Sequence, residues 1–205
     1  MRKIGFRRQT GVSMIETLVV FPIVILMGFG IVHLGLVYQA RANLEYAALM
    51  GARIGSVSSI DIGRMRTEIA KRLDASRVGP GAVDPNAITI TILNPSVQMF
   101  LDCGEEPTDN GACDGGLGQC EIPFYGLQFR PTTANCDGVS IQDANILRIK
   151  VTYAFDSKVP FMNMKLFASD DGDLDGNDNT VDINAVATVR MQTPARMTAV
   201  NEGYF

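Results

Sequence analysis

The sequence has few of the side chains on which most catalytic sites depend. It contains one histidine, His33, and no tryptophan in 205 residues. It also has no glycine-rich phosphate loop and no dinucleotide-binding fingerprint. Because His33 falls inside an apolar run, a Ser-His-Asp or Cys-His arrangement cannot be built outside that run. Paired carboxylates are the remaining catalytic option, and the sequence favours a protein that is not an enzyme.

Charged residues are absent from residues 17–38, TLVVFPIVILMGFGIVHLGLVY. At about 1.5 Å of rise per helical residue, this run spans a hydrocarbon core of roughly 30 Å. The sequence therefore predicts one transmembrane helix. His33 is then either a proton-relay residue or, near the outer end of the span, a side chain that reaches the membrane interface.

Basic residues are concentrated at the N-terminus of a chain whose formal net charge is −4. Four of the 18 basic residues lie in the first eight positions, which leaves 14 basic against 22 acidic residues in the rest of the chain. An acidic body of this kind argues against nucleic-acid binding. The basic leader predicts a cytoplasmic N-terminus, with everything after about residue 40 outside the membrane.

Cysteine is also sparse, and all four residues lie in the outer part of the chain. No Cys-x-x-Cys pair is present, and the only histidine is in the predicted span, so a zinc site is the weaker alternative. An oxidising compartment favours two disulfides, for which three connectivities are possible. The residues concerned are Cys103, Cys113, Cys120 and Cys136.

Good helix formers continue beyond the span, so that one helix is predicted from about residue 13 to residue 55. Ala47, Gly51 and Gly55 recur every four residues and form a stripe on which another backbone can pack closely. Alternatively, Gly55 only caps the helix. A second, amphipathic helix is predicted within residues 59–75, with Met65, Ile69 and Leu73 on its apolar face.

Three later segments alternate apolar and polar residues, which is typical of half-buried strands: 87–95, 147–155 and 180–193. They predict an antiparallel sheet with one covered face, and the outer half of the long helix is the expected cover. The glycine-rich segment 102–140, with all the cysteines, is expected to be an irregular, cross-linked insertion. The fold class is therefore α+β.

An acidic stretch near the C-terminus, DDGDLDGNDNTVD, has the oxygen-ligand spacing of a calcium loop. Glycine follows the third ligand and would allow the sharp turn that such a loop needs. An acidic hairpin turn in solvent is the alternative interpretation. The predicted structural calcium ligands are Asp171, Asp173, Asp175, Asn177 and Asp182.

The N-terminal segment allows three interpretations. In the first it is a secretory signal, cut after the small residues of Ala40-Arg41-Ala42. In the second it is an uncut signal anchor for an extracytoplasmic calcium-binding or adhesive module unrelated to pili. The third starts from Glu16, an acidic residue at the start of the apolar run, five residues after Gly11.

A basic leader, Gly11, Glu16, an apolar run with an early Pro22, and a helix ending in YAALMGARIG follow one another in residues 7–57. This arrangement resembles the TadE-like family of minor pilins, or pseudopilins, of tight-adherence (Tad) pilus systems. One position departs from the family pattern, since Thr17 stands where an aromatic residue usually follows the glutamate.

The resemblance implies that a membrane-embedded prepilin peptidase cuts after Gly11 and leaves Val12 as the new N-terminus. It also implies that Glu16 and the Val12 amine contact neighbouring subunits, and that the partners are other Tad pilins and the assembly machinery. The expected organisation is a leader at 1–11, a long helix at 12–57 and a periplasmic domain at 58–205. The expected location is the bacterial inner membrane, with a single pass and a pseudopilin-like fold.

Overall fold

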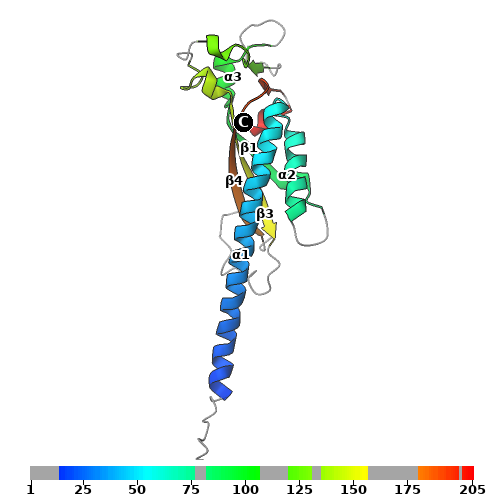
Figure 1. Cartoon of the computed structure of the whole chain (residues 1–205), viewed down its shortest axis with the longest axis vertical. Helices are drawn as coiled ribbons and strands as arrows, with labels where there is room; N and C mark the ends of the chain where they lie inside the picture. Colours follow the sequence, from blue (N-terminus) through cyan, green and yellow to red (C-terminus); the bar gives the residue numbers. More distant parts are fainter. Residues whose placement is uncertain (1–13, 77–81, 107–119, 131–134, 157–179, 199) are drawn as a thin grey trace, which may run out of the picture.

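The protein consists of a long helix that projects from a small α+β body (Figure 1). The computed structural model describes residues 14–76, 82–106, 120–130, 135–156, 180–198 and 200–205. The first part of the long helix extends alone from the body, whereas its second part lies against a sheet and a second helix. This layout confirms the predicted fold class.

Helix α1 (Met14–Val57) is continuous through the whole apolar run and beyond it. Its 44 residues correspond to a length of about 66 Å at 1.5 Å per residue. Pro22 lies inside the helix, in its third turn, where it removes one backbone hydrogen bond without ending the helix. The helix starts one residue after the predicted position and ends two residues after it.

Helix α2 (Ile62–Ser76) packs against the second half of α1 through the predicted small-residue stripe. A Cβ atom added at Gly51 would lie 2.5 Å from Cγ1 of Ile69, and one added at Gly55 would lie 2.7 Å from Sδ of Met65. Gly55 therefore serves close helix packing and is no cap, since α1 continues to Val57. On the exposed side of α2, Arg72 Nε donates a hydrogen bond to Glu68, which raises the pKa of the guanidinium.

A tight turn connects the two helices and has unusual backbone conformations. Ser59 and Ile60 have φ values of 53° and 65°, in the left-handed region that a β-branched residue seldom occupies. Two side chains from the C-terminal segment hold this turn. Thr193 Oγ1 accepts a hydrogen bond from the Ser59 amide at 3.1 Å, and buried Asn201 donates its Nδ2 hydrogen to the Ile60 carbonyl at 3.2 Å.

The main sheet has the order β1-β3-β4, and both strand pairs are antiparallel. Its strands are β1 (Ile88–Asn94), β3 (Ile146–Asp156) and β4 (Thr180–Arg190). Helix α1 lies against β3 and β4, and the alanines of β4 on this face are buried. The buried side chains of the covered face are Ile88, Ile90, Ile92, Leu147, Ile149, Val151, Ile183, Ala185 and Ala187.

The described part of residues 102–140 is more regular than the sequence predicts. It contains β2 (Cys120–Ile122), which pairs antiparallel with β5 (Ala195–Met197) in a second, two-stranded sheet. Short helices complete this end of the molecule: α3 (Val97–Cys103), η2 (Leu127–Phe129), α4 (Ile141–Ala144) and η3 (Glu202–Tyr204). A further short helix, η1 (Pro85–Ala87), precedes β1 and contacts α2. Strands of three residues are too short to give a recognisable alternation, which is why the pattern did not predict them.

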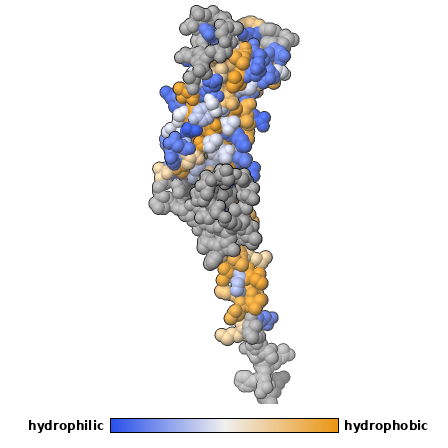
Figure 2. Space-filling model, turned by 180° about the vertical axis from the view of Figure 1, so that it is seen from behind, coloured by the Kyte–Doolittle hydropathy of each residue, from blue (hydrophilic) through white to orange (hydrophobic). Residues whose placement is uncertain are grey.

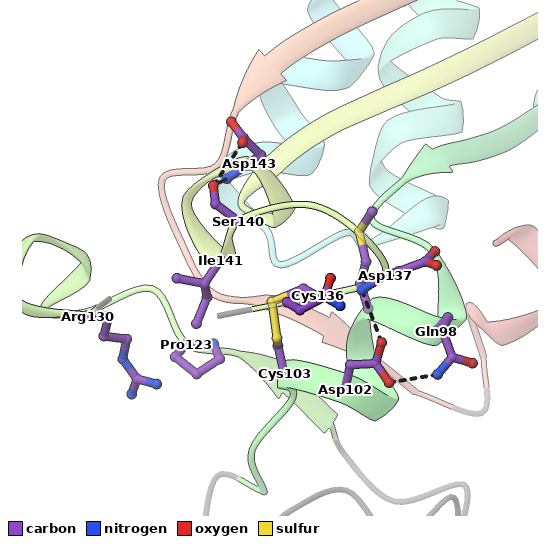
Figure 3. Close-up of a disulfide and its surroundings, with 12 residues drawn as sticks. Gln98, Asp102, Cys103, Pro123, Arg130, Cys136, Asp137, Ser140, Ile141 and Asp143 are labelled. Carbon is purple, nitrogen blue, oxygen red and sulfur yellow. Dashed lines mark hydrogen bonds between the residues drawn. A yellow bond between two sulfur atoms is a disulfide. The ribbon is translucent and has the colours of Figure 1, made fainter. Parts of the chain in front are cut away.

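One disulfide joins the end of α3 to the segment before α4. Cys103 and Cys136 are 33 residues apart in the sequence, and their Cα atoms are separated by 5.5 Å. Figure 3 shows this disulfide beside Pro123 and Ile141, and it links α3 to the chain that follows η2. Cys120 is also disulfide-bonded, and Cys113 lies outside the described residues.

Candidate anchoring and assembly surface

The first half of α1 exposes an apolar surface of a size that water-soluble domains do not tolerate. The most apolar part of this helix is 0% buried within the molecule, and the mean hydropathy of that part is 2.4. Figure 2 shows this part as an almost unbroken apolar surface below the body. The exposed large side chains include Met14, Leu18, Val19, Val20, Phe21, Ile23, Val24, Leu26, Met27, Ile31, Val32 and Leu34.

This surface fits a lipid environment rather than a partner on one face only. A helix that packs against a single neighbour has one apolar stripe, whereas here apolar side chains occur on all sides of the helix. The helix is long and apolar enough to cross a membrane once. Exposed apolar area of this extent, near the N-terminus of the chain, indicates a single-pass membrane anchor.

Glu16 lies in the first turn of α1, at the end of the apolar surface that is farthest from the body. Its side chain is exposed, and a carboxylate at this position is favoured by the positive end of the helix dipole. Among the described residues before Arg41 it is the one Asp, Glu, Lys or Arg side chain of the helix. Gly11 and Val12, the other two predicted processing and contact residues, lie outside the described residues.

His33 lies on the same helix, 17 residues after Glu16, where its side chain is half-buried. At about 1.5 Å per residue, the two side chains are separated by roughly 26 Å along the helix axis. They cannot act on one another directly within one subunit. The structure therefore does not bring Glu16 and His33 of one subunit together.

The predicted calcium ligands are mostly outside the part of the chain that the structure describes. Asp171, Asp173, Asp175 and Asn177 fall in the range 157–179, whereas Asp182 lies on β4, exposed and opposite Ala154. Within the described ranges, no three His, Cys, Asp or Glu side chains lie together as a metal site would need. Calcium stays a prediction.

One described region that the sequence did not mark as functional is the aromatic segment beside the disulfide. Tyr125 and Phe129 are among the most exposed large side chains outside the apolar half of α1. The sequence signal for this site is weak, because aromatic residues in a loop predict burial as readily as exposure.

Comparison with known families gives one match. Residues 11–53 match the family described as TadE-like protein. The matched range begins at Gly11 and ends inside α1, four residues before the helix does. No curated protein and no solved structure matches the chain. TadE-like proteins are generally structural, and the match suggests a protein associated with Tad pilus systems. The N-terminal segment, which forms the apolar half of α1 and most of its packed half, is therefore TadE-like.

Proposed function

We propose that this protein is a minor pilin or pseudopilin that supports the assembly of a Tad-type adhesive pilus and has no catalytic activity. The observation that carries the proposal is the division of α1, together with the TadE-like match that covers both parts of it. One half of the helix is bare and apolar, and the other half forms the core of the outer domain. Such a subunit can be held in a membrane and then transferred into a bundle of similar helices.

The proposed topology follows from the distribution of charge. Four basic residues precede the span, and the outer part of the chain is acidic. This asymmetry favours a cytoplasmic N-terminus and a periplasmic outer domain in the bacterial inner membrane. The disulfide between Cys103 and Cys136 agrees with an oxidising compartment on that side.

Glu16 has a proposed role in subunit assembly. A carboxylate next to lipid is costly when it is alone, and cleavage after Gly11 would create a positively charged amine on Val12 nearby. We propose that Glu16 of an incoming subunit pairs with the Val12 amine of a neighbouring subunit, which neutralises both charges in a medium of low dielectric constant. Prepilin peptidase and other Tad pilins are the partners that this role requires.

N-terminal sequencing of the mature protein is the first test. The proposal expects Val12, as prepilin peptidase cleavage after Gly11 requires. Met1 would favour the alternative function, an uncut signal anchor for a calcium-binding or adhesive module. Asn43 would indicate a secreted protein cut after Ala42. The last result is the hardest to reconcile with the structure, because α1 runs through this position and Leu44 is fully buried in the core.

A charge-neutralising variant tests the assembly contact. Glu16→Ala and Glu16→Gln are expected to insert in the membrane at the wild-type level but to lose co-purification with other Tad pilins. Glu45→Ala is the matched control, since Glu45 is an exposed glutamate on the packed half of the same helix. Unchanged co-purification of the two Glu16 variants would exclude this role for the residue, whatever the N-terminal sequence proves to be.

Calcium binding by the acidic loop is a separate proposal, of which the structure describes only Asp182. Calcium is expected to raise the melting temperature of the outer domain, and replacement of Asp173 by Asn is expected to abolish that increase. A melting curve that responds to neither calcium nor chelator would refute it. The alternative function gains support if calcium binds while the mature N-terminus is Met1.

A further inference from the structure

The outer face of the main sheet, on the side away from α1, carries three basic side chains for which the described residues supply no carboxylate partner. On β3, Arg148 and Lys150 are exposed and alternate with buried Leu147 and Ile149, so both lie on the outer face. Arg190, the last residue of β4, is exposed as well. The three are named here the basic face. Within the described ranges, the arginines that form ion pairs are different ones: Arg41, Arg64, Arg72, Arg130 and Arg196.

The strand register brings the three positive charges of the basic face together. Arg148 pairs with Thr188, and Ile146 pairs with Arg190, so Arg190 is a diagonal neighbour of Arg148 on the adjacent strand. Diagonal neighbours of this kind are roughly 7–8 Å apart. Lys150 follows two residues after Arg148, or roughly 7 Å along β3. Like charges at these distances repel one another, and a bound anionic group would relieve that repulsion.

The residues around the basic face add hydrogen-bond donors and no nearby acid. Exposed Thr91 pairs with Lys150, and exposed Thr188 pairs with Arg148, so a hydroxyl lies beside each of these two cations. Both hydroxyls can donate to a carboxylate oxygen. Among the outward-facing strand residues whose side chains are described, the acidic one is Asp182. It is six residues from Thr188 along β4, or roughly 20 Å away.

The surroundings of the basic face restrict what can bind to it. After the first eight positions, the chain has 14 basic against 22 acidic residues, so a long polyanion would be repelled by the rest of the domain. Anionic lipid is also a poor fit. Strand β3 ends on the side of the body that faces the exposed half of α1, whereas Arg148 lies near its other end (Figure 1). A short acidic peptide segment satisfies both conditions.

The chain itself contains a segment of this kind. Residues 170–178 have five aspartates in nine positions and no lysine or arginine. The segment follows β3 in the sequence, and Arg148 is eight residues before the strand end at Asp156, or roughly 26 Å from it. The 13 residues 157–169 span at most about 43 Å when extended, so the segment of a neighbouring copy can reach the basic face. Within one chain the three cations are exposed, which leaves the basic face open to a second copy.

We propose that the basic face binds the acidic segment 170–178 of a neighbouring copy of this chain. Arg148 and Arg190 each offer a planar fork of N–H donors that suits a carboxylate, and Lys150 adds a third positive charge. Because two different surfaces meet, the contact can repeat from copy to copy instead of closing a pair. It gives the outer domains a contact of their own, beyond the one proposed for Glu16. The charges are exposed, so added salt weakens the contact.

Recognition is tested with a synthetic peptide of residues 168–182 and the full chain in lipid nanodiscs. Fluorescence anisotropy of the labelled peptide measures binding at low and at physiological salt, with a chelator present so that calcium does not occupy the peptide. Binding is expected at low salt and should weaken by about tenfold or more at physiological salt. A peptide with asparagine in place of every aspartate should not bind. Failure of the acidic peptide to bind at low salt would overturn the proposal, as would equal binding of both peptides.

Variants of equal charge separate the basic face from the overall field of the protein. R148Q/K150Q removes two positive charges from the basic face, and R53Q/K71Q removes two from exposed positions on α1 and α2. The first variant is expected to weaken peptide binding by about fivefold to tenfold, and the second by about twofold or less. Arg190→Gln, which leaves β3 unchanged, should weaken binding by about threefold. Equal binding by the two double variants would contradict a site on the outer face of the sheet.

Cross-linking tests whether a second copy supplies the acidic segment. Liposomes hold a mixture of unlabelled and isotope-labelled full chains, and a carbodiimide joins the Lys150 amine to a carboxylate in contact with it. Mass spectrometry should find Lys150 linked to residues 170–178 in mixed-isotope pairs, with few links at Lys71, an exposed lysine on α2. Links confined to one isotope, or equally frequent at both lysines, would overturn the proposal. Neither test needs a pilus, so both are independent of the assembly role proposed for Glu16.

Discussion

The two halves of α1 differ in almost everything except their backbone. Before about residue 37 the helix is surrounded by exposed large apolar side chains, and after Leu44 it presents small or buried ones to the body. The first half contains glycines with nothing near them, Gly28, Gly30 and Gly35. In the second half, Gly51 and Gly55 are in contact with α2. Glycine therefore allows close helix packing in the second half of α1, whereas in the first half it lies in open space.

This difference shows which solvent each half is adapted to. The second half stabilises the outer domain through close packing, in which a single added carbon atom meets a neighbour. The most apolar part of the first half is 0% buried, so length and hydropathy are the main constraints on its lipid-facing side chains. Paired substitutions, one in each half, can therefore separate the two roles.

Truncation of a leucine in each half should give the largest contrast. Leu44 is fully buried, and Leu44→Ala is expected to reduce the free energy of unfolding of the outer domain by about 2–5 kcal/mol. Leu34 is 69% exposed, and Leu34→Ala is expected to leave it unchanged. Hydrogen exchange of the β3 amides in the nanodisc-bound protein measures both. A large loss in Leu34→Ala would mean that the first half also packs on the body.

A charge placed in the first half should impair membrane insertion rather than the stability of the outer domain. Met27 is exposed near the middle of the predicted span, and Met27→Arg is expected to disfavour membrane insertion by about 2.5–3.5 kcal/mol. The folding of the outer domain should not change. Val57→Arg, at an exposed position in the last turn of the packed half, is the control. Carbonate extraction of membranes measures the difference, and equal retention of both variants would contradict a lipid-facing first half.

The sequence was sufficient to predict the long helix, its two halves and the three strands of the main sheet. Each of these elements has a period that persists over many residues, as in the burial of Met65 and Ile69 on one face of α2. The pairing of Cys103 with Cys136 could not be chosen among three connectivities, because the distance between cysteines depends on how the segments fold in space. The second sheet and the segment 123–130, with its exposed Tyr125 and Phe129, were not predicted either. Their order comes from single contacts, such as that of Asn145 with the Pro123 carbonyl, and such contacts leave no repeating pattern.

Added methyl groups on two glycines test the packing more gently. Gly51→Ala gains up to about 1 kcal/mol of helix propensity, but its Cβ would lie 2.5 Å from Ile69 Cγ1. We expect a net loss of about 0.5–2 kcal/mol in the free energy of unfolding. Gly35→Ala, with nothing within 4 Å, should be neutral or slightly stabilising. Urea unfolding of the outer domain distinguishes the two, and a stabilised Gly51→Ala would show that α2 can move away from α1 at little cost.

The smallest effect is expected at the boundary between the halves. Arg41 and Glu45 form an ion pair at 3.4 Å one turn apart, with 63% and 57% of their side chains exposed. Exposed pairs of this kind contribute about 0.5 kcal/mol or less, and arginine preceding glutamate is the less favourable order. A double-mutant cycle of Arg41→Ala and Glu45→Ala, read by urea unfolding, should give a coupling energy within that limit. A coupling well above about 1 kcal/mol would mean that the pair is shielded from water in the membrane-bound protein. The change from lipid to water would then lie closer to the body than the exposed side chains indicate.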